Sequence, residues 1–129
     1  MHNNIQSILR KQRDFFRSGS TLTVDFRKEQ LIKLKAAIKH AEAEITEALI
    51  QDFAKPPFET FLTETGFLLA EITFALKHLD RWVKPARVRT AITHIGSKGM
   101  IMPEPYGVTL IIAPWNYPFQ LALAPLVAA

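Results

Sequence analysis

The sequence contains no cysteine, and this absence excludes several kinds of chemistry within the chain. Disulfide frameworks, thiolate metal sites and cysteine nucleophiles all need a thiol. Histidine is also scarce. The four histidines, at positions 2, 40, 78 and 94, are far apart and show no spacing typical of metal ligands, so we predict no metal site.

Positive charge exceeds negative charge only slightly. The formal net charge is +4, with 22% charged and 48% apolar residues, which is typical of a globular protein. The basic residues gather in two clusters, at 10–17 and 84–89, and neither cluster carries aromatic residues at a recognisable motif spacing. We therefore predict no nucleic-acid partner. The hypothesis of binding through the second cluster would require association that weakens steeply with salt.

Uninterrupted hydrophobic runs of membrane length are also lacking. The mostly apolar stretch 107–129 is long enough to span a bilayer, but three prolines, Asn116 and Gln120 interrupt it. The first 17 residues contain no signal-peptide core and resemble a transit peptide only loosely. We predict a cytoplasmic protein with no membrane segment in this part.

Two long stretches carry apolar residues every third or fourth position, which predicts helices at 25–53 and 58–82, besides a short amphipathic helix at 3–17. Asp25 is the predicted N-cap of the first long helix, with a possible break at 40–42. Because the Pro56-Pro57 connection is short, the two helices are predicted to pack as an antiparallel pair. The predicted buried face of the second comprises Phe58, Phe61, Leu62, Thr65, Leu68, Leu69, Ile72, Leu76, Leu79, Trp82 and Val83.

The character of the sequence changes after Pro85. Residues 86–104 are predicted to form a connector with short edge strands around 90–95 and 99–103. The β-branched and aliphatic run 108–112 then predicts a strand buried on both faces, followed by a turn at 113–117 and a helix opened by Pro118. Strand, turn and helix form the first half of a βαβ unit, and ligands bind at the carboxyl ends of such strands.

These features predict an α/β fold in three parts. Residues 1–85 form a helical segment, 86–104 the connector, and 105–129 the start of a dinucleotide-binding domain. The sequence stops inside an apolar helical run, and no second strand follows to complete the unit. We therefore expect that it is the opening part of a larger protein.

The run from Pro105 to Pro118, with Pro-Trp-Asn-Tyr-Pro at its end, resembles the signature of the NAD(P)-dependent aldehyde dehydrogenase superfamily. Residues 13–19, 27–31 and 82–85 are similar to the amino-terminal helices of that superfamily. The short start and residues 16–21 resemble most closely the branch that contains class 3 and fatty aldehyde dehydrogenases. The resemblance implies amino-terminal helices that lead into the first strand, turn and helix of a Rossmann-like cofactor-binding domain.

The resemblance also implies a reaction, the oxidation of an aldehyde to a carboxylate with NAD or NADP through a cysteine thiohemiacetal and thioester. Asn116 is the implied catalytic residue, donating its side-chain amide to the oxyanion. Ile112, Ala113, Pro114, Trp115 and Asn116 are the implied cofactor-binding residues. From the residues alone, turn packing stays open for Pro114 and Trp115, and an Asx turn that caps the next helix stays open for Asn116.

The family's cysteine nucleophile, glutamate base and ribose-binding lysine all lie, by this resemblance, beyond residue 129. We therefore expect the chain alone to be inactive, and the intact enzyme to act on an aldehyde as a homo-oligomer, with a dimer favoured. An alternative is a stand-alone helical interaction module that binds a partner through its apolar carboxyl-terminal end.

Overall fold

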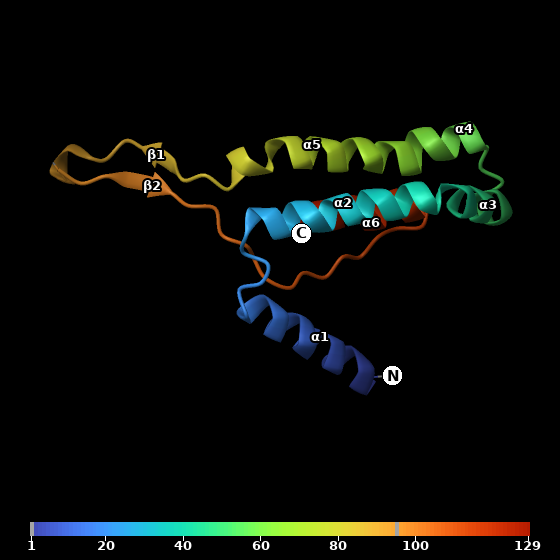
Figure 1. Cartoon of the computed structure of the whole chain (residues 1–129), viewed down its shortest axis with the longest axis horizontal. Helices are drawn as coiled ribbons and strands as arrows, with labels where there is room; N and C mark the ends of the chain where they lie inside the picture. The colour runs from blue at the N-terminus through green and yellow to red at the C-terminus, as the bar shows by residue number, and fades with distance from the viewer. Residues whose placement is uncertain (1, 95) are drawn as a thin grey trace.

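Nearly all of the regular structure is helical in the computed structural model, which describes residues 2–94 and 96–129 (Figure 1). The helical elements are α1 (His2–Arg17), α2 (Val24–His40), α3 (Glu42–Phe53), α4 (Pro57–Thr60), the π-helical turn η1 (Phe61–Thr65), α5 (Gly66–Trp82), the 3₁₀ turn η2 (Ile92–His94) and α6 (Pro118–Ala128). Strands β1 (Ala86–Val88) and β2 (Gly99–Ile101) form an antiparallel hairpin that projects away from the helices (Figure 1). No helix among the described residues is both long and apolar enough to cross a bilayer.

Helices α2 and α5 pack as the predicted antiparallel pair. Two contacts establish the direction, because Lys28 Nζ donates to Asp80 Oδ2 at 2.6 Å and Lys35 Nζ donates to Thr73 Oγ1 at 2.6 Å. As the residue number rises along α2, the partner's number falls along α5. The predicted break between α2 and α3 is also confirmed, since α2 ends at His40 and α3 begins at Glu42.

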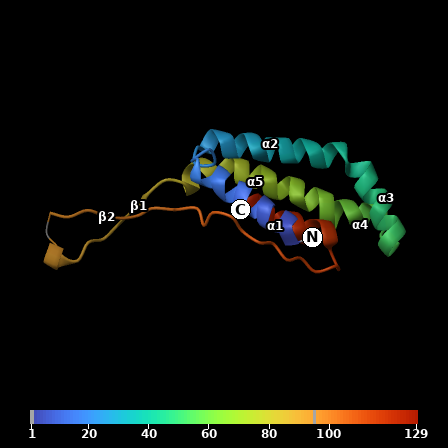
Figure 2. The same ribbon diagram turned by 90° about the horizontal axis from the view of Figure 1, so that it is seen from below.

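The third helix of the core is α6, which lies against α5 (Figure 2). Ile38 of α2 and Leu68 and Ile72 of α5 form the buried centre. The residues of α6 packed against that centre are Phe119, Leu123, Ala124 and Val127. Their spacing places them on one face of the helix, so α6 is held to the α2–α5 pair by apolar contact.

The helix ends show one wrong prediction and one unusual backbone conformation. The N-cap of α2 is Thr23, whose Oγ1 accepts from the Phe26 amide at 3.3 Å. Asp25 instead lies in the first turn, where the helix dipole favours a carboxylate. Helix α3 ends at Ala54, which adopts the left-handed conformation with φ of 51°.

The predicted buried face of 58–82 is correct for Thr65, Leu68 and Ile72, but it is wrong before them and at Trp82, which is 44% exposed. Phe58 is 74% exposed, and Phe61 and Leu62 are about half exposed. The reason is η1, where the Gly66 amide donates to the Phe61 carbonyl five residues earlier. A π turn contains one residue more than an α-helical turn, so the apolar stripe of α5 does not continue in phase into α4.

The strand predictions for 86–112 are partly wrong. The first strand of the connector lies at 86–88 rather than 90–95, and Ile95 lies outside the described residues. The second is found at Gly99–Ile101, where Val88 pairs with Gly99. The predicted buried strand at 108–112 is irregular, with Leu110 84% exposed, because no described strand lies beside it to pair with its backbone.

Candidate functional site

The five predicted site residues lie in one exposed segment that ends at α6. Ile112 and Trp115 are 85% and 81% exposed, Pro114 and Asn116 are also exposed, and Ala113 is half-buried. The segment therefore presents two large apolar side chains and one primary amide to the solvent. The prediction that Pro118 opens the following helix is confirmed, since Pro118 is its first residue.

The amino terminus of α6 receives its hydrogen-bond acceptor from another part of the chain. Tyr117 is the N-cap residue, and its side chain forms no cap bond. Instead, the backbone amide of Gln120 donates to Glu64 Oε2 at 2.7 Å. Among the described residues, the Asn116 side chain makes no hydrogen bond, so the Asx turn considered for it is not formed.

Glu64 belongs to a buried ion pair with Lys55. Lys55 Nζ lies 2.6 Å from Glu64 Oε1, and the two side chains are 7% and 0% exposed. The same ammonium group lies 4.4 Å from the centre of the Tyr117 ring, in cation–π geometry. We call Lys55, Glu64, Tyr117 and Gln120 the cap cluster.

The cap cluster satisfies the Glu64 carboxylate at both oxygen atoms. Oε1 accepts from the Lys55 ammonium group and Oε2 from the Gln120 amide. A buried carboxylate without such partners would be strongly unfavourable. Its negative charge also lies at the positive end of the α6 dipole, which adds a favourable interaction. The cluster thus satisfies the buried carboxylate and joins three separate segments.

Local backbone features place the two charged residues. The left-handed Ala54 reverses the chain at the end of α3, and the next amide, of Lys55, donates back to Leu49 O at 3.3 Å. The Ala54 amide itself donates to Ile50 O at 2.9 Å, which is the hydrogen bond of the αL capping motif. Glu64 lies within η1, two residues before Gly66, the glycine that the Phe61 carbonyl oxygen approaches closely.

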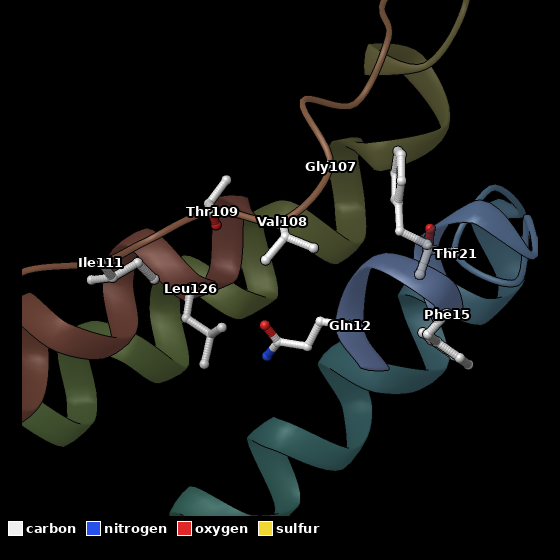
Figure 3. A pocket seen from close by; sticks show the side chains of 9 residues that line it. Gln12, Phe15, Thr21, Gly107, Val108, Thr109, Ile111 and Leu126 are labelled. Atoms are coloured by element: carbon white, nitrogen blue, oxygen red, sulfur yellow. The ribbon is translucent and has the colours of Figure 1, made fainter. Parts of the chain in front are cut away.

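A cleft of about 390 Å³ lies between α1, the 107–111 segment and α6 (Figure 3). In Figure 3 the Gln12 side chain of α1 extends toward Leu126 of α6. The lining residues are Gln12, Phe15, Phe16, Thr21, Gly107, Val108, Thr109, Ile111 and Leu126. Asn116 is not among them, so this cleft and the predicted site are separate features of the chain.

Sequence reasoning missed the cap cluster, although one signal was available. Glu64 precedes Leu68 and Ile72 by four and eight residues, so it falls on the buried stripe of its own helix. A carboxylate on a buried stripe requires a partner inside the protein. Its partners, Lys55 and Gln120, could not be identified in the same way, because both contacts depend on tertiary packing.

The exposed segment has properties that fit a bound dinucleotide. Ile112 and Trp115 offer uncovered apolar surface, and the backbone of 108–114 is irregular, outside the described strands and helices. Backbone groups without ladder partners and adjacent apolar side chains are features of ligand-binding segments. Within the described ranges, no group of three or more metal-binding side chains lies close enough together to hold a metal ion.

Comparison with known proteins gives a consistent result. The sequence profile described as the aldehyde dehydrogenase family matches residues 2–129. The chain is 47% identical over 115 residues to 4,4'-diaponeurosporen-aldehyde dehydrogenase of Staphylococcus aureus, covering 89% of this chain and 25% of that protein. It is 35% identical over 129 residues to aldehyde dehydrogenase family 3 member F1 of Arabidopsis thaliana, covering 100% of this chain and 27% of that protein. Human aldehyde dehydrogenase family 3 member B1 is 39% identical over 121 residues, which cover 94% of this chain and 26% of that protein.

A solved structure supports the fold. The substrate-bound state of Staphylococcus aureus AldH superposes with a TM-score of 0.92 at 44% identity, covering 95% of this chain and 27% of that chain. The predicted fold class, an incomplete α/β aldehyde dehydrogenase fold with amino-terminal helices, is confirmed by this likeness. This chain spans about a quarter of the length of the relatives it matches. None of these relatives supports the alternative of an interaction module.

Proposed function

Since the chain belongs to the aldehyde dehydrogenase family, we propose that it acts as the amino-terminal part of an enzyme that oxidises an aldehyde to a carboxylate with NAD or NADP. The observation that carries the proposal is the exposed amide of Asn116 on a turn whose following helix is fixed by buried contacts. A donor for developing negative charge must be both accessible and held in place. Asn116 is accessible, and the helix that follows it is fixed by the Gln120 contact with Glu64.

We propose that Asn116 donates its side-chain N–H to the oxygen that becomes negative when a thiolate adds to the aldehyde carbonyl. An amide suits this role because it is a neutral donor whose state does not change with pH. A donor of this kind typically contributes ~10²–10³ in turnover, because it is aimed at charge that develops only in the transition state. No other side chain competes for the Asn116 amide among the described residues.

We propose that Ile112, Ala113, Pro114 and Trp115 hold the dinucleotide through backbone and apolar contacts. When bound, the cofactor supplies the nicotinamide ring that accepts hydride from the substrate. The exposed Ile112 and Trp115 side chains would be covered by this contact, which removes apolar surface from water. Asn116 then lies at the end of the same segment, next to the reacting carbonyl.

The thiolate must come from outside these 129 residues, because the sequence contains no cysteine. We therefore propose that the chain alone does not oxidise aldehydes. We also propose that the complete enzyme is a homo-oligomer, with a dimer favoured, as the class 3 resemblance implies.

The proposal can be tested in a joined enzyme, in which this chain replaces the matched quarter of the Staphylococcus aureus 4,4'-diaponeurosporen-aldehyde dehydrogenase. The assay follows aldehyde-dependent formation of the reduced nicotinamide by absorbance. We expect the joined enzyme to be active and the 129-residue chain alone to be inactive. A joined enzyme that is folded and monodisperse, by circular dichroism and light scattering, but inactive would contradict the proposed function.

A further inference from the structure

We propose that Glu64 is a positioning residue for Asn116, acting through the amino terminus of α6. This inference rests on the proposed function, because it assigns to Glu64 the placement of the oxyanion donor. Glu64 does not touch the substrate in this account. It holds the turn that carries Asn116, through the Gln120 amide on one side and through Lys55 and Tyr117 on the other.

The start of α6 places Asn116 close to the contact that Glu64 makes. The first hydrogen bond within the helix runs from the Leu121 amide to the Tyr117 carbonyl, at 3.0 Å. Tyr117 is therefore the N-cap residue, and Asn116 lies directly before it. The Gln120 amide lies in the same first turn and has no partner within α6, so its bond to Glu64 fixes the orientation of that turn.

A second contact is made on Tyr117. Lys55 Nζ lies over the Tyr117 ring, 4.4 Å from its centre, while it also pairs with Glu64. The side chain directly after Asn116 is thereby held by the same ion pair that binds the helix amide. Two contacts in different directions restrict rotation of the turn more than either contact alone.

The support for these contacts is rigid. Glu64 leads into α5, where Leu68 and Ile72 are completely buried in the core. An ordinary N-cap bonds its own helix and fixes only local geometry. Glu64 instead bonds an amide 56 residues away, so it ties the turn to the core. A donor displaced by about 1 Å can lose about 10²-fold in rate, which makes such a tie relevant to catalysis.

The first experiment measures the turn directly, by hydrogen exchange of the Gln120 amide in the 129-residue chain. For Glu64→Gln we expect exchange about tenfold faster than in the unmodified chain, because one charge-assisted bond is weakened. The matched control is Glu71→Gln, which removes an exposed carboxylate from α5, the helix that directly follows η1. We expect no change there. Equal exchange in both variants would overturn the claim that Glu64 holds the turn.

The second experiment measures catalysis in the joined enzyme and uses a variant that keeps the fold. Lys55→Met with Glu64→Leu removes both buried charges at similar volume, a replacement that proteins often tolerate. We expect kcat to fall about 10–100-fold, with the aldehyde KM changed by less than about threefold, since a misplaced donor affects the transition state more than substrate binding. Folded variants with unchanged kcat would overturn the inference.

A double-mutant cycle separates positioning from a general structural effect. If Glu64 acts through Asn116, then in an enzyme that already carries Asn116→Ala the Lys55→Met and Glu64→Leu changes should lower kcat by less than about a further twofold. If the kcat losses of the Asn116→Ala variant and of the Lys55→Met, Glu64→Leu variant multiply in the combined variant, the inference is overturned. An inactive but folded unmodified joined enzyme would overturn the proposed function and the catalytic half of this inference, whereas the exchange experiment would still decide whether Glu64 holds the turn.

Discussion

Replacing Gly66 by alanine tests the π turn on which the cap cluster is built. In an ordinary helix interior this change stabilises a protein by about 1 kcal/mol, because alanine is the better helix former. Gly66 is different, since a Cβ there would lie 2.5 Å from the Phe61 carbonyl oxygen and 3.1 Å from the Phe61 ring. For Gly66→Ala, helix propensity therefore predicts a gain in the free energy of unfolding, whereas packing predicts a loss.

The packing effect should prevail. Real Cβ atoms are essentially never closer than 3.0 Å to another heavy atom, so a Cβ 2.5 Å from the Phe61 carbonyl oxygen requires the backbone to shift. Overpacking of this kind costs about 1–3 kcal/mol, and loss of the Gly66-to-Phe61 hydrogen bond costs about 1 kcal/mol more. After the propensity gain is subtracted, we expect Gly66→Ala to destabilise the chain by about 1–3 kcal/mol.

The assay is thermal unfolding of the 129-residue chain followed by far-ultraviolet circular dichroism. A loss of about 2 kcal/mol in a chain of this size should lower Tm by about 5–10 °C. The matched control is Ala70→Gly, the reverse change at an exposed position of α5, which should cost only the propensity of about 1 kcal/mol. A rise in Tm for Gly66→Ala would refute the reasoning, because it would mean that the π turn places no demand on this residue.

Further predictions concern the core, the helix ends and the ion pair, each measured by unfolding of the 129-residue chain in urea. Ile72→Ala should cost about 2–5 kcal/mol, because Ile72 is completely buried between helices; a cost below 1 kcal/mol would contradict that packing. Ala54→Gly should stabilise by about 0.5–1 kcal/mol, since it relieves a left-handed alanine; destabilisation would mean that Ala54 is not left-handed in solution. Thr23→Ala should cost about 0.5–2 kcal/mol as a lost N-cap, and no cost would remove Thr23 from that role. Lys55→Met should cost about 3–5 kcal/mol because it leaves a buried charge unpaired, and adding Glu64→Leu should restore most of that loss; no restoration would show that the cost lies elsewhere.

The sequence predicted the helical core well because periodicity reports burial on one face. The antiparallel α2–α5 pair, the break at Ala41 and the start of α6 at Pro118 all followed from apolar spacing and proline chemistry. The N-cap was misplaced by two residues, since Thr23 and Asp25 are both residue types that cap helices. Local patterns do not decide between two such candidates.

The two larger errors have tertiary causes. The π turn adds a residue to the helix, and nothing in the apolar pattern distinguishes it from a regular turn, so Phe58 and Phe61 were placed on the wrong face. The run 108–112 has the composition of a buried strand, but a strand also needs neighbours for its backbone, and composition does not provide them.

The candidate site likewise has one part that a local motif predicts and one part that depends on tertiary packing. The Pro-Trp-Asn-Tyr-Pro motif alone predicts Asn116 as a site residue, and that role stays a prediction. The cap cluster depends on contacts between Glu64 and residues distant in sequence, and only the three-dimensional structure brings Lys55, Tyr117 and Gln120 to one carboxylate.

The most direct test of the account is the turnover of the joined enzyme carrying Asn116→Ala. We expect kcat to fall by ~10²–10³ while the cofactor KM changes by less than about threefold, because the lost amide stabilises charge that develops only in the transition state. A kcat within about threefold of the unmodified joined enzyme would contradict the account, as would a loss expressed only in the cofactor KM.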